Sequence, residues 1–435
     1  QRGIMIETIH YAESVSGTVG LPGDKSISHR YALLAAIAEG ESTLEHFARS
    51  RDCRSTLGCL RALGVDVRES AGTVTIRGRG LRGLREPQGP LDAGNSGTTM
   101  RLLSGILAGH PFAASIAGDD SLNSRPMGRI IDPLRRMGAS VTSREKGLPP
   151  LGIRGGRLAG IRYVLPVASA QVKSCVLLAG LYGSGPTAVE EAVPTRDHTE
   201  IALGEFGAVV RRRGPWIEVD PDPVLRGRRL CVPGDLSAAA FFLAAAALAP
   251  RAELRLPGVG LNGRRRELLD YLAEAGLDIE ITEETAEAGE PRGDLLVRSS
   301  PRLAAGGLPP IRGDRAAALI DEIPVLSVLG SQTAGGVEIA DAGELRVKES
   351  DRIAAVALNL RAMGVDVEET RDGLRVPGGR PLGGADIEPR GDHRIAMAFA
   401  VAGLSARGET RIHGAECADV SYPGFWDALR AVARP

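Results

Sequence analysis

The chain has very few aromatic residues. Phe, Trp and Tyr together make up 3% of its 435 residues, whereas glycine occurs 56 times. A core with so few rings has to be built from Ala, Leu, Val and Ile with close backbone packing, which is typical of layered α/β proteins. Hydrophobic residues at 43% and charged residues at 25% exclude wholesale disorder. The composition therefore favours a folded α/β protein, and the length suggests two or three domains of about 150 residues each.

Lysine is also scarce, and occurs only at positions 25, 146, 173 and 348. All other members of the set of 53 basic residues are arginine. Lysine offers a compact point charge, or a group able to release its proton, which arginine does not. Each lysine in this background is therefore a candidate for a specific task.

Cysteine pairs, net charge and long apolar runs are missing as well. The five cysteines form neither a Cys-x-x-Cys pair nor a Cys/His cluster, so we expect no disulfide framework, no structural metal and a reduced, cytoplasmic protein. A net charge of −1 argues against a nucleic-acid-binding protein. The longest apolar run, residues 238–249, is shorter than the roughly 18 residues that span a bilayer, and no signal-peptide pattern opens the chain. We therefore expect no membrane partner.

The chain contains a repeated pattern in which a short polar segment opens a run of small apolar residues. The six segments lie at residues 22–26, 94–98, 169–173, 233–237, 321–324 and 391–394. Ser, Asp and Asn at such places are signals for the N-cap of a helix. A second recurring pattern, seen at 60–67, 134–141, 272–279 and 360–367, predicts a helix that ends in glycine and leads into a strand.

These repeats divide the chain into two halves. Pro-Gly-Asp-x-Ser occurs at 22–26 and again at 233–237, an offset of about half the chain. We therefore predict two similar domains of three repeat units each, namely residues 22–232 and residues 1–21 with 233–435. The first strand is expected to belong to the C-terminal half.

The predicted helix starts carry cations. Backbone N–H groups at a helix N-terminus bind anions, and neighbouring Lys and Arg side chains add charge. The cations at or near these starts are Lys25, Arg30, Arg125, Lys348, Arg352 and Arg394. If the starts converge, the site will bind a small ligand with several negative charges, carrying phosphate, carboxylate or both.

Three of these motifs allow more than one interpretation. Asp321 could be an ordinary N-cap before Pro324, or a proton acceptor near a bound hydroxyl. Lys348 and Arg352 would share a helix face if the helix began that early, and an anion between them would relieve their repulsion. Lys173 belongs to a helix-start motif but could instead lie on the outer face of its helix.

The motifs as a set resemble the 5-enolpyruvylshikimate-3-phosphate synthase family of enolpyruvyl transferases. They are Leu-Pro-Gly-Asp-Lys-Ser-Ile-Ser-His-Arg at 21–30, Gly-Asn-Ser-Gly-Thr-Thr-Met-Arg at 94–101, Ala-Ser-Ala-Gln-Val-Lys-Ser at 168–174, Arg-Val-Lys-Glu-Ser-Asp-Arg at 346–352 and Asp-His-Arg-Ile-Ala-Met at 392–397. The resemblance implies an α/β fold of two domains, each with three βαβαββ units in an inside-out arrangement, and an active site in the cleft between them. It also implies a shikimate-pathway enzyme of aromatic amino acid biosynthesis, which moves the enolpyruvyl group of phosphoenolpyruvate to the 5-hydroxyl of shikimate 3-phosphate. No metal or organic cofactor is implied, and we expect a monomer.

The same resemblance implies roles for individual residues. Contacts to shikimate 3-phosphate are implied for Lys25, Ser26, Arg30, Ser169, Ala170, Gln171, Arg196, Asp321 and Lys348. Contacts to phosphoenolpyruvate are implied for Lys25, Asn95, Gly97, Arg125, Gln171, Arg352 and Arg394. The catalytic residues would be Asp321, which takes the proton of the 5-hydroxyl, Glu349, which protonates the methylene carbon, and Lys25. A tetrahedral intermediate would then lose phosphate.

One departure and two alternatives remain at this point. Many family members carry a lysine before the aromatic-Pro pair of the C-terminal motif, where this chain has Val420. An enolpyruvyl transferase acting on UDP-N-acetylglucosamine would carry a reactive cysteine before its Arg-Pro segment, and residues 121–126 contain none. A non-catalytic anion-binding repeat protein would need the cations but neither Asp321 nor Glu349.

Overall fold

The computed structural model describes residues 5–286 and 289–435, which form two compact units. One unit, the N-unit, comprises Gly23–Val232 together with Gly289 and Glu290. The other, the C-unit, comprises residues 5–22, 233–286 and 291–435.

The N-unit contains three repeats, in which strands and helices follow one another in the same order. The second repeat runs β6 (Leu91–Asp92), α3 (Gly97–Leu107), β7 (Ala113–Ala117), α4 (Asp120–Asn123), α5 (Gly128–Arg136), β8 (Ser140–Thr142), η1 (Glu145–Gly147), β9 (Leu151–Arg154). The third runs β10 (Arg162–Val164), α6 (Ala170–Gly180), β11 (Thr187–Glu190), α7 (His198–Phe206), β12 (Val210–Arg213), β13 (Trp216–Val219). In both, the first two strands are parallel and the last two complete a four-stranded sheet in antiparallel pairing. Apart from the short α4 and η1, this is the βαβαββ order.

The first repeat of the N-unit takes its opening strand from the far end of the unit. It contains α1 (Lys25–Ile37), β3 (Glu41–Glu45), α2 (Arg51–Ala62), β4 (Asp66–Ser70), β5 (Thr73–Arg77) and the late strand β14 (Arg229–Cys231). β14 pairs in parallel with β3, in the place that β6 and β10 hold in the other two sheets. The start and the end of this unit are thereby joined in one sheet.

The C-unit is less regular. Its first repeat runs β2 (Ser14–Thr18), α8 (Leu236–Leu248), β15 (Arg251–Gly260), α9 (Glu267–Glu274), β16 (Asp278–Thr285), β17 (Arg292–Arg298), and β23 (Ala433–Arg434) adds a fifth strand to its sheet. Next come α10 (Pro301–Ala305), α11 (Asp314–Ala318), α12 (Ile323–Ser331), β18 (Val337–Ile339), η2 (Gly343–Val347), α13 (Arg352–Ala362), β19 (Glu368–Glu369), β20 (Leu374–Val376). Last are β21 (Asp386–Ile387), α14 (His393–Gly403), β22 (Thr410–His413), η3 (Ala415–Val420), α15 (Phe425–Val432), with β1 (Ile6–Ile9) paired to β22. The first strand of the chain thus belongs to this unit.

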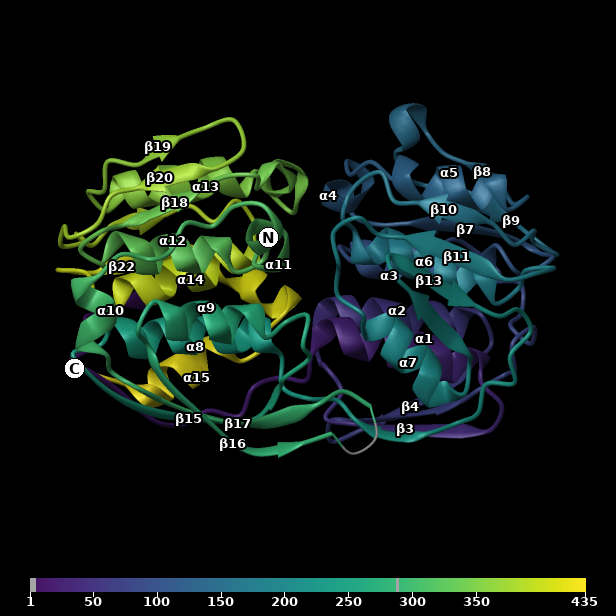
Figure 1. Cartoon of the computed structure of the whole chain (residues 1–435), viewed down its shortest axis with the longest axis horizontal. Coiled ribbons are helices and arrows are strands. Elements are labelled where there is room, and N and C mark those ends of the chain that lie inside the picture. The colour runs from purple at the N-terminus through teal and green to yellow at the C-terminus, as the bar shows by residue number, and fades with distance from the viewer. Residues whose placement is uncertain (1–4, 287–288) are drawn as a thin grey trace. The chain divides into compact units, whose positions relative to one another are not determined.

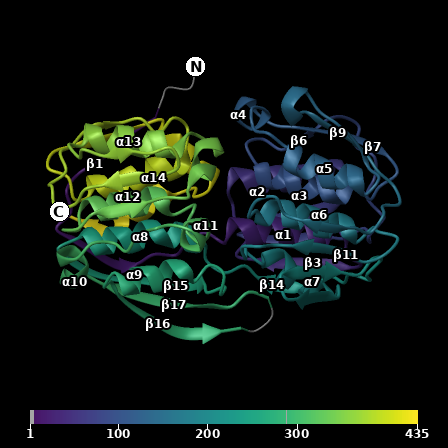
Figure 2. The same ribbon diagram turned by 45° about the horizontal axis from the view of Figure 1, so that its top comes forward.

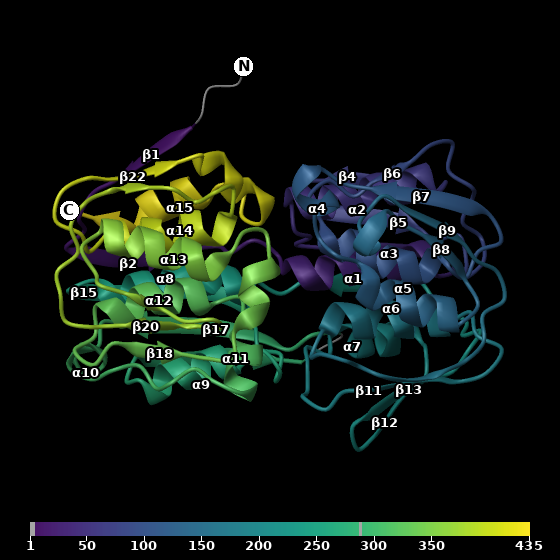
Figure 3. The same ribbon diagram turned by 90° about the horizontal axis from the view of Figure 1, so that it is seen from above.

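In each unit the first helix of every repeat lies at the centre, and the sheets lie outside these helices. In the C-unit α8, α12 and α14 contact one another, and β15 and β17 pack on α8 (Figures 1 and 2). In the N-unit α3 contacts both α1 and α6, while β11 and β13 pack on the outer side of α6 (Figure 3). A central helix has little or no solvent face, so apolar residues are favoured on all its sides. The Ala-rich α8 meets this demand, since all its residues except Leu248 are buried.

The predicted helix starts are confirmed at the beginnings of these central helices. α1, α3, α6, α8 and α14 begin directly after Asp24, Ser96, Ser169, Asp235 and Asp392, and each of these side chains accepts a backbone N–H of its own first turn. Within the described part of the chain, every helix is too short or too polar to cross a membrane.

Candidate active site

The predicted substrate contacts of the N-unit lie at or beside the starts of its central helices. At α1, Lys25 Nζ lies 2.8 Å from Asp52 Oδ2, and 16% of the lysine side chain is exposed. Gly23 precedes the cap because a Cβ at this position would lie 1.9 Å from the carbonyl oxygen of His46. The close passage of these two segments fixes the direction in which the α1 N-terminus points.

Arg30 joins three helices of the N-unit. Its guanidinium donates to Ser26 O at 2.8 Å, to Thr199 Oγ1 at 2.7 Å and to Ser174 Oγ at 2.9 Å. Burial lowers the pKa of Arg30 to about 10, and the positive charge of Arg196 contributes to the decrease. Arg196, on the segment before α7, therefore lies within electrostatic reach of the α1 start.

A second group of contacts links the starts of α3 and α6. Gln171 accepts a hydrogen bond from Arg101 Nη1 at 2.6 Å and donates one to Thr98 Oγ1 at 2.9 Å. A Cβ at Gly97 would lie 2.6 Å from Arg101 Nη1, so a side chain there would displace Arg101. Glycine at 97 therefore keeps Arg101 available to hold Gln171.

Arg125 and Asn95 form a third contact in this unit. Arg125 Nη2 donates to Asn95 Oδ1 at 2.8 Å and to Ser121 Oγ at 3.0 Å, while Asn95 Nδ2 donates to Asp119. Only 8% of Arg125 is exposed. Arg125, placed before Pro126 on the segment that follows α4, is thereby oriented toward the α3 start.

A buried hydroxyl network supports these helix starts from within. Thr56 Oγ1 lies 2.7 Å from both His29 Nδ1 and Thr99 Oγ1, and Thr99 Oγ1 donates to Ser96 Oγ. Burial first, and then the charges of Lys25 and Arg30, hold the pKa of His29 well below its usual value. His29 is therefore neutral at physiological pH and connects α1 to α2 and α3 without adding charge.

In the C-unit the predicted residues converge on one guanidinium. Arg352 is 1% exposed and donates to Glu349 Oε2 at 2.6 Å, to Asp392 Oδ2 at 2.8 Å and to Asp321 Oδ1 at 3.3 Å. Burial alone would lower the pKa of Arg352, but Asp392, Glu349 and Asp321 outweigh it and raise that pKa. Burial likewise opposes ionisation of Asp392, and the charge of Arg352 reverses this, so the pKa of Asp392 lies below its usual range.

Two more cations complete this C-unit cluster. Lys348 Nζ lies 3.8 Å from Asp321 Oδ1, and Arg394 Nη2 lies 3.8 Å from Asp321 Oδ2. Arg394 Nη1 also donates to the backbone oxygen of Asp321 at 2.9 Å. Asp321 thus lies among three cations, and two of the three predicted catalytic residues share one cluster.

The sequence did not indicate the support behind Arg394. Glu322, 1% exposed, accepts from Ser237 Oγ at 2.5 Å and from Arg265 Nη2 at 3.0 Å, and it lies 3.7 Å from Arg394 Nη1. These groups are far apart in the chain and carry no shared spacing. The available signals were two of the predicted helix-start segments, 233–237 with Ser237 and 321–324 with Glu322, and neither indicated that these two side chains meet.

The structure corrects three details of the sequence interpretation. Lys348 and Arg352 do not share a helix face, because α13 begins at Arg352 and Lys348 precedes it in extended backbone. Asp321 is not the N-cap of α12, which is Glu322. Lys173 does not lie on the outer face of α6, since it is fully buried at 0% exposure.

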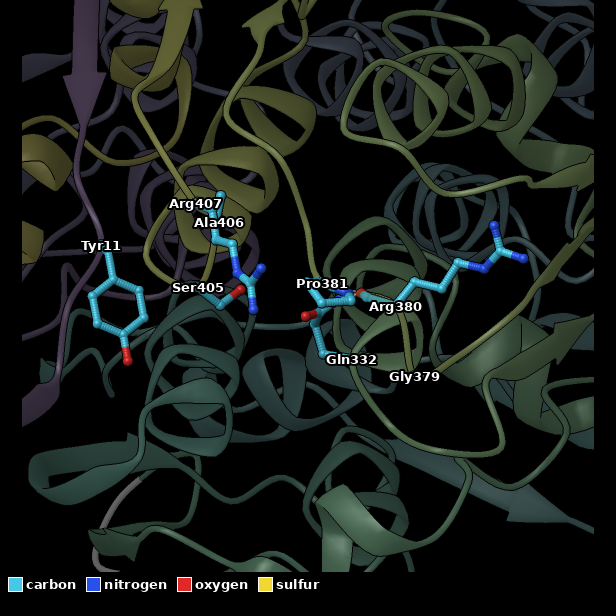
Figure 4. Close-up of a pocket in the computed structure, with 8 residues that line it drawn as sticks. All are labelled: Tyr11, Gln332, Gly379, Arg380, Pro381, Ser405, Ala406 and Arg407. Carbon is cyan, nitrogen blue, oxygen red and sulfur yellow. The ribbon is translucent and has the colours of Figure 1, made fainter.

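A separate pocket in the C-unit contains none of the predicted site residues. It has a volume of about 550 Å³ and is shown in Figure 4. Its lining residues are Tyr11, Gln332, Gly379, Arg380, Pro381, Ser405, Ala406 and Arg407. This lining has cations but no carboxylate, so it lacks a proton acceptor of the kind that Asp321 and Glu349 provide. Among the described residues, no three His, Cys, Asp or Glu side chains gather as a metal site would require.

Comparisons with known proteins agree with the geometry of both units. The family model described as EPSP synthase (3-phosphoshikimate 1-carboxyvinyltransferase) matches residues 9–429. The 3-phosphoshikimate 1-carboxyvinyltransferase of Solibacter usitatus is 52% identical, with 99% of this chain and 100% of that protein covered. That of Desulforudis audaxviator is 50% identical, with 97% and 98% covered.

The structural comparison gives the same answer. A solved structure of EPSP synthase from Acinetobacter baumannii superposes with a TM-score of 0.88 at 41% identity, covering 99% of this chain and 98% of that one. The inside-out arrangement of two three-repeat units is the fold shared with that structure. From its sequence, its fold and its relatives, the chain belongs to the EPSP synthase (3-phosphoshikimate 1-carboxyvinyltransferase) family.

Proposed function

We propose that this chain transfers the enolpyruvyl group of phosphoenolpyruvate to the 5-hydroxyl of shikimate 3-phosphate and releases phosphate. The family match over residues 9–429 supports this reaction over both alternatives, the UDP-N-acetylglucosamine enzyme and the non-catalytic repeat protein. One structural observation carries it. Asp321 and Glu349, the two carboxylates that the chemistry needs, lie on the same guanidinium, that of Arg352.

We assign the recognition of shikimate 3-phosphate largely to the N-unit. Its proposed contacts are Lys25, Ser26, Arg30, Ser169, Ala170, Gln171 and Arg196, with Asp321 and Lys348 from the C-unit. The hydrogen bonds of Arg30 to α6 and α7 support this grouping, because they tie together the segments that carry most of these residues. Converging helix N-termini and cations favour a phosphorylated acid at this place.

Phosphoenolpyruvate would be held by residues of both units. Its proposed contacts are Lys25, Asn95, Gly97, Arg125, Gln171, Arg352 and Arg394. We propose one active site to which both domains, 22–232 and 1–21 with 233–435, contribute these groups. The N-unit would supply most of the substrate-binding residues, and the C-unit would supply Asp321 and Glu349 for proton transfer, so neither unit alone would carry out the reaction.

The chemistry then follows from the C-unit cluster. Asp321 would accept the proton of the 5-hydroxyl while Glu349 delivers a proton to the methylene carbon, which makes the adjacent carbon electrophilic. The hydroxyl oxygen attacks that carbon and forms a tetrahedral intermediate. As the C–O bond to phosphate breaks, the new methyl group loses a proton to the Glu349 carboxylate, which restores the carbon–carbon double bond. Lys25 and the arginines would stabilise the negative charge that develops on the phosphate and carboxylate groups.

The cluster also suggests how the substrate prepares these carboxylates. In the structure, Glu349 Oε2 and Asp321 Oδ1 accept hydrogen bonds from the Arg352 guanidinium. An incoming phosphate or carboxylate group offers the same guanidinium a competing acceptor of equal or higher charge. Binding of phosphoenolpyruvate would thereby release Glu349 and Asp321 for proton transfer.

The test is phosphate release from phosphoenolpyruvate with each of two acceptors. We expect release with shikimate 3-phosphate and none with UDP-N-acetylglucosamine. Release only with the UDP sugar would assign the chain to the other enolpyruvyl transferase, and binding without release would support a non-catalytic protein. The same preparation tests the expected monomer by sedimentation.

A further inference from the structure

A buried ionic cluster in the N-unit joins α6 to the segment that carries Arg196. The cluster is centred on Lys173, in the first turn of α6, whose Nζ lies 2.9 Å from Glu191 Oε2 and 2.7 Å from Glu200 Oε1. Glu191 follows β11, and Glu200 lies in the first turn of α7. One ammonium therefore holds both ends of the segment from residue 191 to residue 200.

Glu191 organises that segment further. Its Oε2 accepts hydrogen bonds from the backbone N–H of Thr195 at 3.0 Å and from Thr195 Oγ1 at 2.8 Å. Its Oε1 accepts one from Arg212 Nη2 at 2.5 Å. Thr195 is the residue directly before Arg196. The backbone that carries Arg196 is thus fixed by a carboxylate that Lys173 holds in place.

Burial and charge make this arrangement specific to lysine. Lys173 is 0% exposed, and the Glu191 side chain is 1% exposed. Burial opposes ionisation of Glu191, but the charge and hydrogen bond of Lys173 and the hydrogen bonds of Thr195 outweigh it, so the pKa of Glu191 lies below its usual value. A compact ammonium fits between two carboxylates, whereas a guanidinium needs a wider, planar site. This accounts for a lysine here in a chain that otherwise uses arginine.

We propose that Lys173 is a positioning residue that sets Arg196 at a fixed place relative to Ser169, Ala170 and Gln171. These three residues form the N-cap and the first two positions of the helix that contains Lys173, two to four residues before it. The ionic cluster holds the segment of Arg196 at a fixed distance from the N-terminus of α6, and both segments carry proposed contacts to shikimate 3-phosphate. The cluster itself contacts neither substrate. This inference rests on the proposed function, in which Arg196 binds shikimate 3-phosphate.

The test is a double-mutant cycle on the full chain with Lys173→Met and Arg196→Met. We expect Lys173→Met to raise the KM for shikimate 3-phosphate about tenfold, while the KM for phosphoenolpyruvate changes less than about twofold. In the Arg196→Met background, the same substitution should change the KM for shikimate 3-phosphate less than about twofold, because its effect is exerted through Arg196. Lys146→Met removes an exposed lysine and serves as the matched control, with unchanged kinetics.

Three outcomes overturn the proposal. Equal increases of both KM values would indicate a general loss of structure, and additive effects in the cycle would show that Lys173 and Arg196 act independently. A KM for shikimate 3-phosphate that Arg196→Met leaves unchanged would remove the proposed role of Arg196, and with it the object that Lys173 positions. The first two outcomes leave the proposed reaction intact, whereas only the third concerns the site assignment.

A milder variant keeps the test decisive should Lys173→Met fail to fold. Thr195→Val removes only the hydroxyl bond to Glu191 and leaves the ion pairs of Lys173 in place. We expect a KM for shikimate 3-phosphate about threefold higher, again without a change for phosphoenolpyruvate. An unchanged KM for shikimate 3-phosphate in this variant would contradict the proposal that the Lys173 cluster positions Arg196.

Discussion

The starts of α1 and α8 are copies of one motif that serve different purposes. Both helices begin at the fourth residue of the motif Pro-Gly-Asp-x-Ser, and both are capped by the aspartate of that motif. This fourth residue is Lys25 in α1, whose ammonium is partly exposed beside Asp52, and Leu236 in α8, which is 1% exposed. One substitution therefore separates a helix start that can meet a substrate from one that belongs to the core.

The final serine of each motif follows the same division. Ser26 is half-buried and offers its carbonyl oxygen to Arg30. Ser237 is buried, and its hydroxyl donates to Glu322 and accepts from Arg265, which places it behind Arg394. In the C-unit the proposed contact with substrate lies instead at the Asp321, Glu349 and Arg352 cluster. The repeat thus provides the helix start, and individual side chains decide its chemistry.

The largest effect on activity is expected from a change in the proposed proton-transfer residues, which lie in the C-unit and have no counterpart in the N-unit motif. Glu349→Gln should bind both substrates and lower turnover about 10³-fold, because the amide cannot deliver the proton. Phosphate release and calorimetric binding of each substrate check this. Asn95→Ala in the N-unit is the contrast, with a higher KM for phosphoenolpyruvate and a smaller change of turnover. Near-normal turnover of Glu349→Gln would remove Glu349 from the mechanism.

Copying the α1 residue into α8 should damage the fold. Leu236→Lys places an ammonium without a partner in the C-unit core, which we expect to lower the free energy of unfolding by about 3 kcal/mol or more. Denaturant unfolding measures the loss, and Leu236→Met, with similar volume and no charge, should lose less than about 1.5 kcal/mol. Equal stability of the two variants would show that position 236 tolerates a charge as position 25 does.

The reverse copy should damage activity more than stability. Lys25→Leu removes the proposed charged contact to both substrates, which should lower kcat/KM for each of them roughly 30-fold, or by about 2 kcal/mol. Steady-state kinetics at saturating co-substrate measure this, with thermal unfolding as the control for the loss of the Asp52 pair. A loss confined to one substrate would contradict the dual role of Lys25.

The smallest effect on stability is expected from the capping aspartate, which the two motifs share. Asp24→Ala and Asp235→Ala each remove a cap and should each lower stability by about 1 kcal/mol. Thermal unfolding of the two variants compares them directly. A large difference between them would mean that the two starts differ in more than the side chains that follow the caps.

Local signals in the sequence were enough to predict the helix starts. The caps at Asp24, Ser96 and Asp392 are formed by side chains bonding within one turn, so a short window of sequence contains both partners. Repetition then indicated which residues begin equivalent helices. The opening strand β14 was not predicted, because its pairing with β3 joins residues almost a whole unit apart.

The partners inside the site could not be predicted in the same way. The rarity of lysine marked Lys173, but nothing near it in the chain identified Glu191 and Glu200, which only the packing of α6 against the 191–200 segment brings close. Arg265, and its pairing with Glu322, were missed for the same reason. Polar residues that become buried need hydrogen-bond partners, and these partners can lie far away in the chain. The spacing of residues in the sequence does not indicate which partners those are.

Glu290, a described residue that the β16–β17 connection gives to the N-unit, limits how this protein can be divided. Glu290 accepts the Nδ1 side of the His198 ring at 2.7 Å, with the histidine taken as the donor, and both side chains are buried. A fragment cut at residues 23 and 232 would keep His198 at the start of α7 but lose this carboxylate. Cleavage at these two junctions would therefore remove a buried partner of His198, so a fragment that keeps the N-unit intact has to retain Glu290.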